Sequence, residues 1–176
     1  MIQRNYLSVS GIDTPAGPLT LASYDKQLCH IDFGTLNETK DHLIQWAKSV
    51  GLPVEIRESE DDLADAVDQI RGYFSGERTS FDLNLMMKGT LFQKKVWTAL
   101  AHIPYGETKT YKEIALAVGN QKAVRAVGGA NNKNPLPIVI PCHRVIGSDG
   151  SLIGYGGGLD KKRLMLHLEK AETVME

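Results

Sequence analysis

A thiol, an imidazole and a guanidinium follow one another at Cys142-His143-Arg144, directly after an Ile-Val-Ile-Pro run at 138–141. Three β-branched apolar residues in a row predict a buried strand over 138–140, and the proline would end its pairing. A free cysteine thiol has a pKa of about 8.5, which a neighbouring imidazole or guanidinium lowers. The segment therefore predicts an activated thiol at the mouth of a strand. The alternative is that Cys142 is a small core residue, as most free cysteines are.

Two short helices with a glycine-containing turn between them are predicted upstream of this thiol. Thr110 and Glu113 form a capping-box pattern at the start of the first helix, and Gly119 ends it after two turns. The second helix, over about 122–131, is rich in alanine and glycine, and Arg125 is the one large side chain in its interior. The pair is typical of a helix-turn-helix. A helix with so little bulk either packs tightly on a core helix or approaches a ligand closely, and the isolated arginine favours a nucleic-acid surface.

The remaining elements divide the chain into two halves. The predicted strands of the first half lie at 6–9, 19–24, 28–33 and 81–85, and its predicted helices at about 38–50 and 60–74. The second half has a helix that begins after Thr90, a glycine-rich loop at 154–158 and a basic C-terminal helix at about 161–170. The three segments between 6 and 33 predict an antiparallel meander. The fold class expected is α+β, with a small mixed sheet-and-helix domain over 1–85 and a mainly helical domain with the helix-turn-helix over 86–176.

The two halves differ in charge. The chain of 176 residues has a formal net charge of −1, but residues 1–85 carry −7 and residues 86–176 carry +6. Both surfaces could simply be solvated, yet a basic half is also what contact with a polyanion requires. The charge distribution is therefore compatible with a nucleic-acid partner for the second half.

Cysteine content and the lack of long apolar stretches indicate which compartment and which kinds of metal or disulfide site to expect. Cys29 and Cys142 are the only cysteines, so neither a disulfide framework nor a four-sulfur zinc site is expected. We expect a cytoplasmic, monomeric protein without membrane contact. Cys29-His30 offers only two adjacent metal ligands, so no metal and no cofactor are expected, and Cys29 is expected to be buried in a strand.

Several motifs in the second half resemble those of the O6-alkylguanine-DNA alkyltransferase family. The active-site signature of that family is matched by Pro-Cys-His-Arg-Val at 141–145. Further ordered matches are Phe-Gln-Lys-Lys-Val-Trp at 92–97, Ile-Pro-Tyr-Gly-Glu-Thr at 103–108, Arg-Ala-Val-Gly-Gly-Ala at 125–130, Asn134-Pro135, Tyr155 with its glycines, and Glu169. The resemblance covers about residues 88–170. Residues 1–85 resemble the ribonuclease-H-like N-terminal domain of the family only in size and strand pattern.

The resemblance implies an irreversible, single-turnover reaction on double-stranded DNA. Cys142 would take the alkyl group from O6 of a guanine that has been rotated out of the helix, and would keep it as a thioether. His143 would act as base, through a water, and Glu169 would orient it and stabilise its charged form. Asn134 would brace the site, and Tyr111 would donate a proton or a hydrogen bond to the departing guanine.

The resemblance also implies how the DNA is held. Arg125 would enter the duplex from the minor groove and fill the space of the flipped base. The bare surface around it would touch the groove, with contacts from Ala123, Ala126, Gly128 and Thr110. The pocket for the base would consist of Val145, Tyr155, Gly156 and Trp97, with the Cys142 and Val145 carbonyls accepting from the guanine amino group and the Tyr155 and Gly156 amides facing O6.

One position departs from some relatives, in which a serine follows the pocket tyrosine. Here the residue is Gly156, which predicts a roomier pocket that accepts groups larger than methyl, and O4-alkylthymine as a further substrate. A non-catalytic protein that binds alkylated DNA is the main rival function, although such relatives lack the cysteine. A regulator with a metal-bound cysteine cluster would need cysteines that this chain lacks. A thiol hydrolase would leave the helix-turn-helix unexplained.

Overall fold

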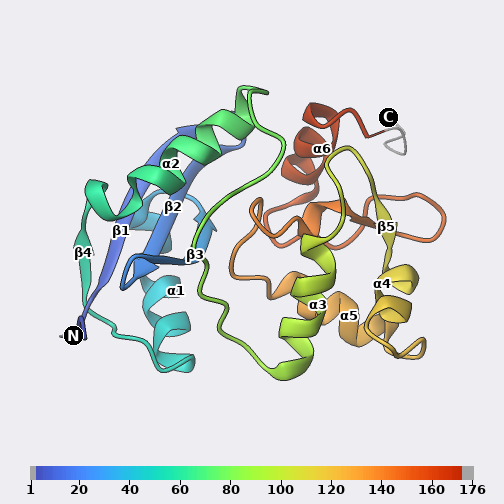
Figure 1. Ribbon diagram of the computed structural model, residues 1–176, viewed down its shortest axis with the longest axis horizontal. Coiled ribbons are helices and arrows are strands. Elements are labelled where there is room, and N and C mark those ends of the chain that lie inside the picture. The colour runs from blue at the N-terminus through green and yellow to red at the C-terminus, as the bar shows by residue number, and fades with distance from the viewer. Residues whose placement is uncertain (1–2, 172–176) are drawn as a thin grey trace. The chain divides into compact units, whose positions relative to one another are not determined.

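The computed structural model describes residues 3–171, which fold as two compact units (Figure 1). The N-terminal unit ends at Lys88 and the C-terminal unit begins at Gly89. The chain is an α+β protein in which a sheet-containing unit precedes a mainly helical one.

The N-terminal unit contains a four-stranded sheet in the order β3-β2-β1-β4. Its strands are β1 (Leu7–Thr14), β2 (Gly17–Tyr24), β3 (Gln27–Phe33) and β4 (Ile56–Glu58). β1 pairs with β2, and β2 with β3, in antiparallel fashion, which confirms the predicted meander. β4 pairs parallel to β1 and was not predicted, because it spans three residues with no buried side chain and therefore carries no alternation.

Two helices pack on this sheet, α1 (Leu36–Ser49) against β2 and β3, and α2 (Glu60–Phe74) against β1 and β2. Both begin at residues that cap their first turn. Thr35 and Glu38 form a capping box at α1, and the Ser59 side chain accepts from the Asp62 amide at α2. Both helices lie where their apolar spacing predicted them. The predicted strand at 81–85 is wrong, because this segment makes only an isolated bridge between Leu85 and Leu28.

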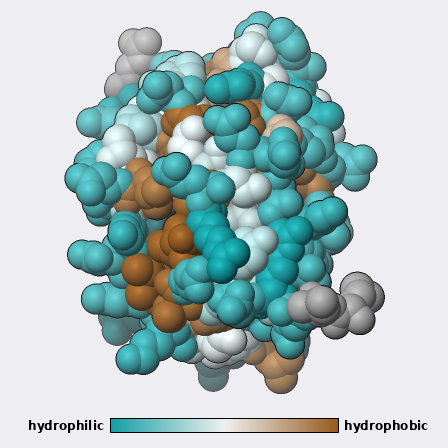
Figure 2. Space-filling view, turned by 90° about the vertical axis from the view of Figure 1, so that its left-hand side faces the viewer, coloured by the Kyte–Doolittle hydropathy of each residue, from teal (hydrophilic) through white to brown (hydrophobic). Residues whose placement is uncertain are grey.

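The surface of the N-terminal unit near β4 and α2 is mainly hydrophilic, with smaller apolar areas (Figure 2). Among residues 3–88, Val54 is the one large apolar residue that is extensively exposed, at 48% of its surface. One cluster of core residues is made of sheet and α1 side chains, and includes Leu7, Val9 and Leu43. This packing fixes α1 against the sheet.

Over residues 89–171, the C-terminal unit contains four α-helices, a short 3₁₀ helix and a two-stranded parallel sheet. Its helices are α3 (Leu91–Ala101), α4 (Tyr111–Ala117), α5 (Val124–Asn132) and α6 (Leu159–Leu168), and its strands are β5 (Lys109–Thr110) and β6 (Val145–Ile146). α3 packs against α4 and α5, and α4 packs against α5, so the predicted helix-turn-helix is α4-α5. Of the predicted capping box at α4, the bond from the Glu113 amide to the Thr110 hydroxyl forms.

The segment before the thiol differs from the prediction. Residues 138–140 form a turn, not a strand, with Ile138 at a φ of 76° and the Ile140 amide bonded to the Leu136 carbonyl at 2.8 Å. Cys142–Arg144 then forms a short 3₁₀ helix, η1, and only the following two residues pair as β6. Ile138 and Ile140 are apolar because they are buried in the core, and a short apolar run does not by itself distinguish a strand from a buried turn.

Candidate active site

Cys142 is the first residue of η1, and 4% of its surface is exposed. Burial raises the pKa of its thiol above the ordinary value, while hydrogen bonds from the Asn134 and Tyr155 side chains and the charge of Lys162 oppose that rise. The expectation that adjacent groups would leave a low-pKa thiol is therefore wrong. Desolvation outweighs these contributions, and the resting thiol is protonated.

His143 points away from solvent toward Glu169. Its Nε2 lies 2.6 Å from Oε2 of Glu169, and neither side chain has any exposed surface. An ionised carboxylate only accepts hydrogen bonds, so Nε2 carries the hydrogen and Nδ1 is the basic nitrogen. The contact therefore selects the tautomer whose other nitrogen can accept a proton.

Arg144 binds the same carboxylate from another side. Its Nε lies 2.7 Å from Oε1 and its Nη2 3.2 Å from Oε2 of Glu169, while Nη1 donates to the Ile103 carbonyl at 2.7 Å. Burial favours protonation of Glu169, but the hydrogen bonds from His143 and Arg144 and the charge of the guanidinium outweigh it, so its pKa is lowered to about 2. The guanidinium was expected to act on the thiol, and it instead holds Glu169 ionised.

The protonation state of His143 follows from the same surroundings. Burial lowers the pKa of the imidazole, and the positive charges of Arg144 and Lys162 add to this, although Glu169 opposes them. The net direction is downward, because burial and the two positive charges together outweigh the carboxylate. At neutral pH His143 is therefore a neutral imidazole, the form that can take up a proton.

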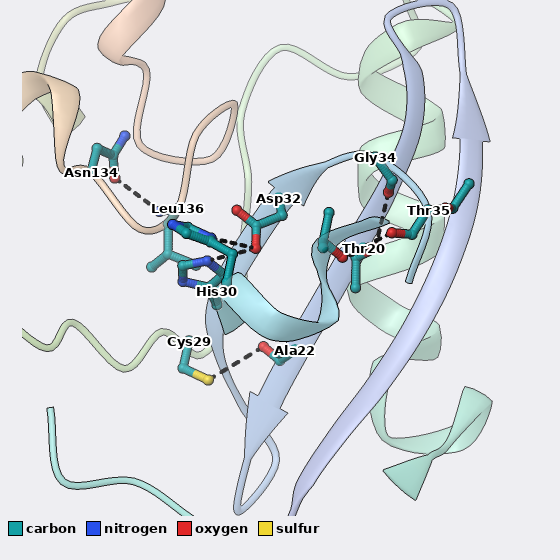
Figure 3. Close-up of polar contacts among 11 residues, drawn as sticks. Thr20, Ala22, Cys29, His30, Asp32, Gly34, Thr35, Asn134 and Leu136 are labelled. Atoms are coloured by element: carbon teal, nitrogen blue, oxygen red, sulfur yellow. Dashed lines mark hydrogen bonds and ion pairs between the residues drawn. The ribbon is translucent and has the colours of Figure 1, made fainter. Parts of the chain in front are cut away.

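Asn134 fixes the turn that precedes the thiol. Its Nδ2 donates to the Ile140 carbonyl at 2.8 Å, and its Oδ1 accepts from the Leu136 amide at 3.0 Å, the second of which is drawn in Figure 3. The same side chain bonds to the Cys142 sulfur. Asn134 thus holds both the backbone turn and the thiol, a geometry suited to the bracing role that the family resemblance implies.

Tyr111 and Lys162 converge on the loop between β6 and α6. The Tyr111 hydroxyl donates to the Ile153 and Gly154 carbonyls at 2.9 and 3.2 Å, and Lys162 Nζ donates to the Ile153 and Val145 carbonyls at 2.9 and 2.5 Å. Lys162 is fully buried, and burial lowers its pKa to about 8, a shift that the charge of a Cys142 thiolate opposes once that thiolate forms. Lys162 was missed in the sequence because it lies between Lys161 and Arg163 in a basic helix and looks solvent-exposed.

A cavity of about 450 Å³ opens beside this loop. Its lining includes Tyr111 from α4, Gly128 and Asn132 from α5, and Ile153 and Gly154 from the loop. The cavity therefore joins the helix-turn-helix to the segment that carries the pocket residues. Burial raises the pKa of the Tyr111 hydroxyl, and the negative charge of a Cys142 thiolate raises it further, so the phenol stays protonated.

The outer face of α5 is accessible and nearly free of bulk. Arg125 and Ala126 are exposed, and Ala123, Gly128 and Thr110 are partly exposed. A methyl group added at Gly128 or at Gly129 would meet no atom within 4 Å. The predicted contact residues are thus at least partly accessible, and Arg125 is the one among them with a long side chain.

None of the four predicted pocket residues, Val145, Tyr155, Gly156 and Trp97, lines this cavity, and neither does Cys142. Val145 is buried in β6, and its carbonyl accepts from Lys162. A Cβ at Gly156 would lie 3.6 Å from the Asn132 carbonyl, which is ordinary contact. Trp97 lies in the core between α3 and α5, with Nε1 bonded to the Ala130 carbonyl at 2.8 Å, and does not line the cavity.

Among residues 3–171, no helix combines the length and the apolar character that crossing a bilayer requires.

Known proteins resemble the chain over nearly its whole length. Residues 91–171 match the DNA-binding domain, and residues 7–87 the ribonuclease-like domain, of 6-O-methylguanine DNA methyltransferase. A methylated-DNA–protein-cysteine methyltransferase of Methanosarcina barkeri is 50% identical over 159 residues, which cover 90% of this chain and 94% of the relative. One from Mycobacterium bovis is 46% identical over 92% of each chain.

Solved structures agree. The crystal structure of Mycobacterium tuberculosis OGT in complex with DNA superposes with a TM-score of 0.77 at 42% identity, covering 94% of this chain and 92% of that one. The crystal structure of the O6-methylguanine methyltransferase of the same organism gives a TM-score of 0.77 at 41% identity, over 97% and 96% of the two chains. On its sequence and its two-part fold, the chain belongs to the methylated-DNA–protein-cysteine methyltransferase family.

Proposed function

We propose that this protein repairs DNA by direct reversal, moving the alkyl group of an O6-alkylguanine in duplex DNA to Sγ of Cys142, once per molecule. The observation that carries the proposal is the buried thiol followed by a neutral imidazole, which a carboxylate–guanidinium pair holds in one tautomer. Thiolate is the best side-chain nucleophile for displacement at carbon. A thiol that stays protonated until a substrate arrives avoids alkylation by other electrophiles.

The residues of the site account for each transfer of atoms and electrons. His143 Nδ1 takes the thiol proton, through a water, and Glu169 stabilises the imidazolium that forms. The thiolate forms a carbon–sulfur bond as the carbon–O6 bond breaks, and the electron pair of the broken bond leaves with the guanine. The Tyr111 hydroxyl exchanges its loop carbonyl acceptors for the base and gives the departing guanine anion a proton or a hydrogen bond. The positive charge on the His143 imidazolium balances the negative charge that remains on the guanine or on the Tyr111 oxygen.

The helix-turn-helix α4-α5 presents the open surface around Arg125 to the minor groove. Minor-groove readout is degenerate, which suits a protein that must find damage in any sequence. Rotating a base out of the stack costs a few kcal/mol, less for a weakly paired lesion. Arg125 fills the vacated space, and the base moves toward Cys142.

The finer features of this function rest on single residues. Gly156 leaves room beside the Asn132 carbonyl, which favours groups larger than methyl and extends the range to O4-alkylthymine. We further propose that the protein acts as a monomer in the cytoplasm, where its two free cysteines stay reduced.

A stoichiometry assay tests the proposal. The protein is mixed with an excess of duplex containing one O6-methylguanine, and restored guanine is counted over time. A plateau at one guanine per protein, which Cys142→Ser abolishes, supports suicide transfer. Tight binding of the lesion duplex without restored guanine would instead identify a damage-binding protein, and repeated turnover would contradict transfer to a retained thioether.

A further inference from the structure

A second cluster of titratable side chains lies in the N-terminal unit, outside the candidate active site. His30 and Asp32 are two residues apart on β3 and so face the same side of the sheet, where α1 packs and presents His42. Nε2 of His30 lies 3.0 Å from Oδ2 of Asp32, and Nδ1 of His42 lies 3.3 Å from the same oxygen (Figure 3 labels His30 and Asp32). One atom from each side chain lies within 4.8 Å of the other two.

We propose that His30, Asp32 and His42 form a binding site for a divalent transition metal, with Zn²⁺ as its ion. Imidazole nitrogen and carboxylate oxygen are ligands that Zn²⁺ prefers. Zn²⁺ binds them at about 2.0–2.2 Å, so ligand atoms of a tetrahedral site are about 3.3–3.5 Å apart. The separations of 3.0 and 3.3 Å are already close to this spacing. A solvent molecule completes the four ligands, because the His42 side chain is 68% exposed.

The three side chains are held on rigid elements, which lowers the cost of ordering them around an ion. The Trp46 ring lies over the His30 ring, with centroids 4.2 Å apart, and His30 is almost fully buried. The Thr39 hydroxyl joins α1 to β2 through a 2.9 Å bond to the Thr20 hydroxyl. The backbone that carries His42 is thus fixed relative to the sheet.

The charge state of the cluster also suits a cation. Burial favours the protonated form of Asp32, but the hydrogen bonds and charges of His30 and His42 outweigh it and lower its pKa. Asp32 is therefore an ionised ligand over the physiological range.

Cys29 does not belong to this site, although it precedes His30. Its sulfur lies 3.5 Å from the Ala22 carbonyl, to which it donates, and burial raises its pKa to about 12. A metal ligand must be the thiolate, so Cys29 stays a core residue. The sequence predicted no metal site because it was judged on Cys29 and His30 alone. The fold instead brings Asp32 and His42 next to His30.

Zn²⁺ titration of the full chain by calorimetry at neutral pH tests the site, in a Cys142→Ala background that removes the thiol of the candidate active site. We expect one ion per chain and a higher unfolding temperature when it is bound. His42→Ala is expected to weaken Zn²⁺ binding more than about tenfold. The change removes a direct ligand, and even the loss of a residue that only hydrogen-bonds to a metal ligand weakens metal binding by about tenfold or more. His42 is exposed, so this change leaves the fold intact. His102→Ala is the matched control, since it removes an exposed histidine of the other unit.

Co²⁺ provides a second readout that does not depend on activity. Co²⁺ held by nitrogen and oxygen is expected to give visible ligand-field bands without a sulfur charge-transfer band, and Asp32→Asn is expected to remove them. The proposal is overturned if the Zn²⁺ affinity of the parent protein does not exceed that of the His42→Ala variant, or if His102→Ala weakens Zn²⁺ binding as much as His42→Ala does. A sulfur charge-transfer band in the Co²⁺ spectrum would also overturn it. None of these outcomes bears on alkyl transfer, because the site shares no residue with the candidate active site.

Discussion

Nε2 of His143 lies 2.6 Å from Oε2 of Glu169, and both side chains are sealed from solvent. The contact fixes the ring nitrogen that faces away from Glu169 as the base. Arg144 keeps the carboxylate ionised, so the pair does not need a charged imidazole to be stable. A neutral base is thereby maintained in a buried site until a thiol proton reaches it.

Replacing Glu169 tests this arrangement through stability. Glu169→Gln leaves the buried Arg144 charge without its counter-ion, and breaking a buried pair in this way costs about 3–5 kcal/mol. We expect a loss of about this size in the free energy of unfolding, measured by urea denaturation. Glu107→Gln, at an exposed glutamate, is the control and should change it by less than about 0.5 kcal/mol. Equal stability of the two variants would show that the ion pair contributes little.

The lowered pKa of Glu169 predicts the pH range over which its contribution to stability is lost. A carboxyl whose pKa falls from 4.5 in its ordinary state to about 2 in the folded chain stabilises the fold fully above pH 4.5. The contribution declines as the pH falls through this interval. The difference in unfolding free energy between the parent protein and Glu169→Gln should therefore shrink between pH 4.5 and pH 2. A difference that stays constant across this range would contradict the assigned ionisation.

The lowered pKa of His143 predicts a pH profile for alkyl transfer. Only the neutral imidazole accepts the thiol proton, and its folded pKa lies below the ordinary 6.5. Single-turnover rates on an O6-methylguanine duplex should fall only when the pH drops below that value, and His143→Ala should remove this limb. An inflection attributable to His143 above pH 6.5 would mean that the ring is charged in the resting protein.

The sequence predicts the features that depend on residues close together in the chain better than those that depend on residues far apart in it. The meander, α1 and α2 were predicted because local alternation and helical spacing determine them. The turn before Cys142 was predicted wrongly as a strand, because burial of Ile138 and Ile140 imitates a strand pattern. Glu169 was identified only through family resemblance, since a pairing across 26 positions leaves no local signal.

Charged residues that the fold buries were the hardest to predict. Lys162 and Arg144 have the sequence surroundings of surface residues, yet the one is fully buried and the other nearly so. Their partners are main-chain carbonyls and a distant carboxylate, which no spacing rule reveals. The cluster of His30, Asp32 and His42 was missed for the same reason, because β3 and α1 meet only in the folded unit.

Arg125 is predicted to act in base extrusion. Arg125→Ala should slow repair of O6-methylguanine in duplex DNA by at least about tenfold, and repair of the same lesion in single strands much less, because an unpaired base needs no replacement in the stack. The side chain is exposed, so stability should be unchanged. Lys122→Ala, which removes an exposed charge just before α5, is the control. An equal loss of repair rate on the duplex and on the single strand would show that Arg125 only contacts the DNA backbone and does not replace the extruded base.

Gly156 is predicted to set the size of the accepted group. A Cβ there would lie 3.6 Å from the Asn132 carbonyl, so Gly156→Ser should fold normally. Its extra atoms should lower the rate with O6-benzylguanine more than the rate with O6-methylguanine, measured in parallel single-turnover reactions. A ratio of the two rates that does not change would show that Gly156 does not limit the pocket.

The most direct test of alkyl transfer to Cys142 is mass spectrometry of the protein after incubation with an O6-methylguanine duplex. Intact mass followed by peptide mapping should show the gain of one methyl group, located on the peptide that contains Cys142 and absent from the peptide that contains Cys29. An unchanged mass, in a protein that still binds the lesion duplex, would contradict the assignment of Cys142, His143 and Glu169 to alkyl transfer.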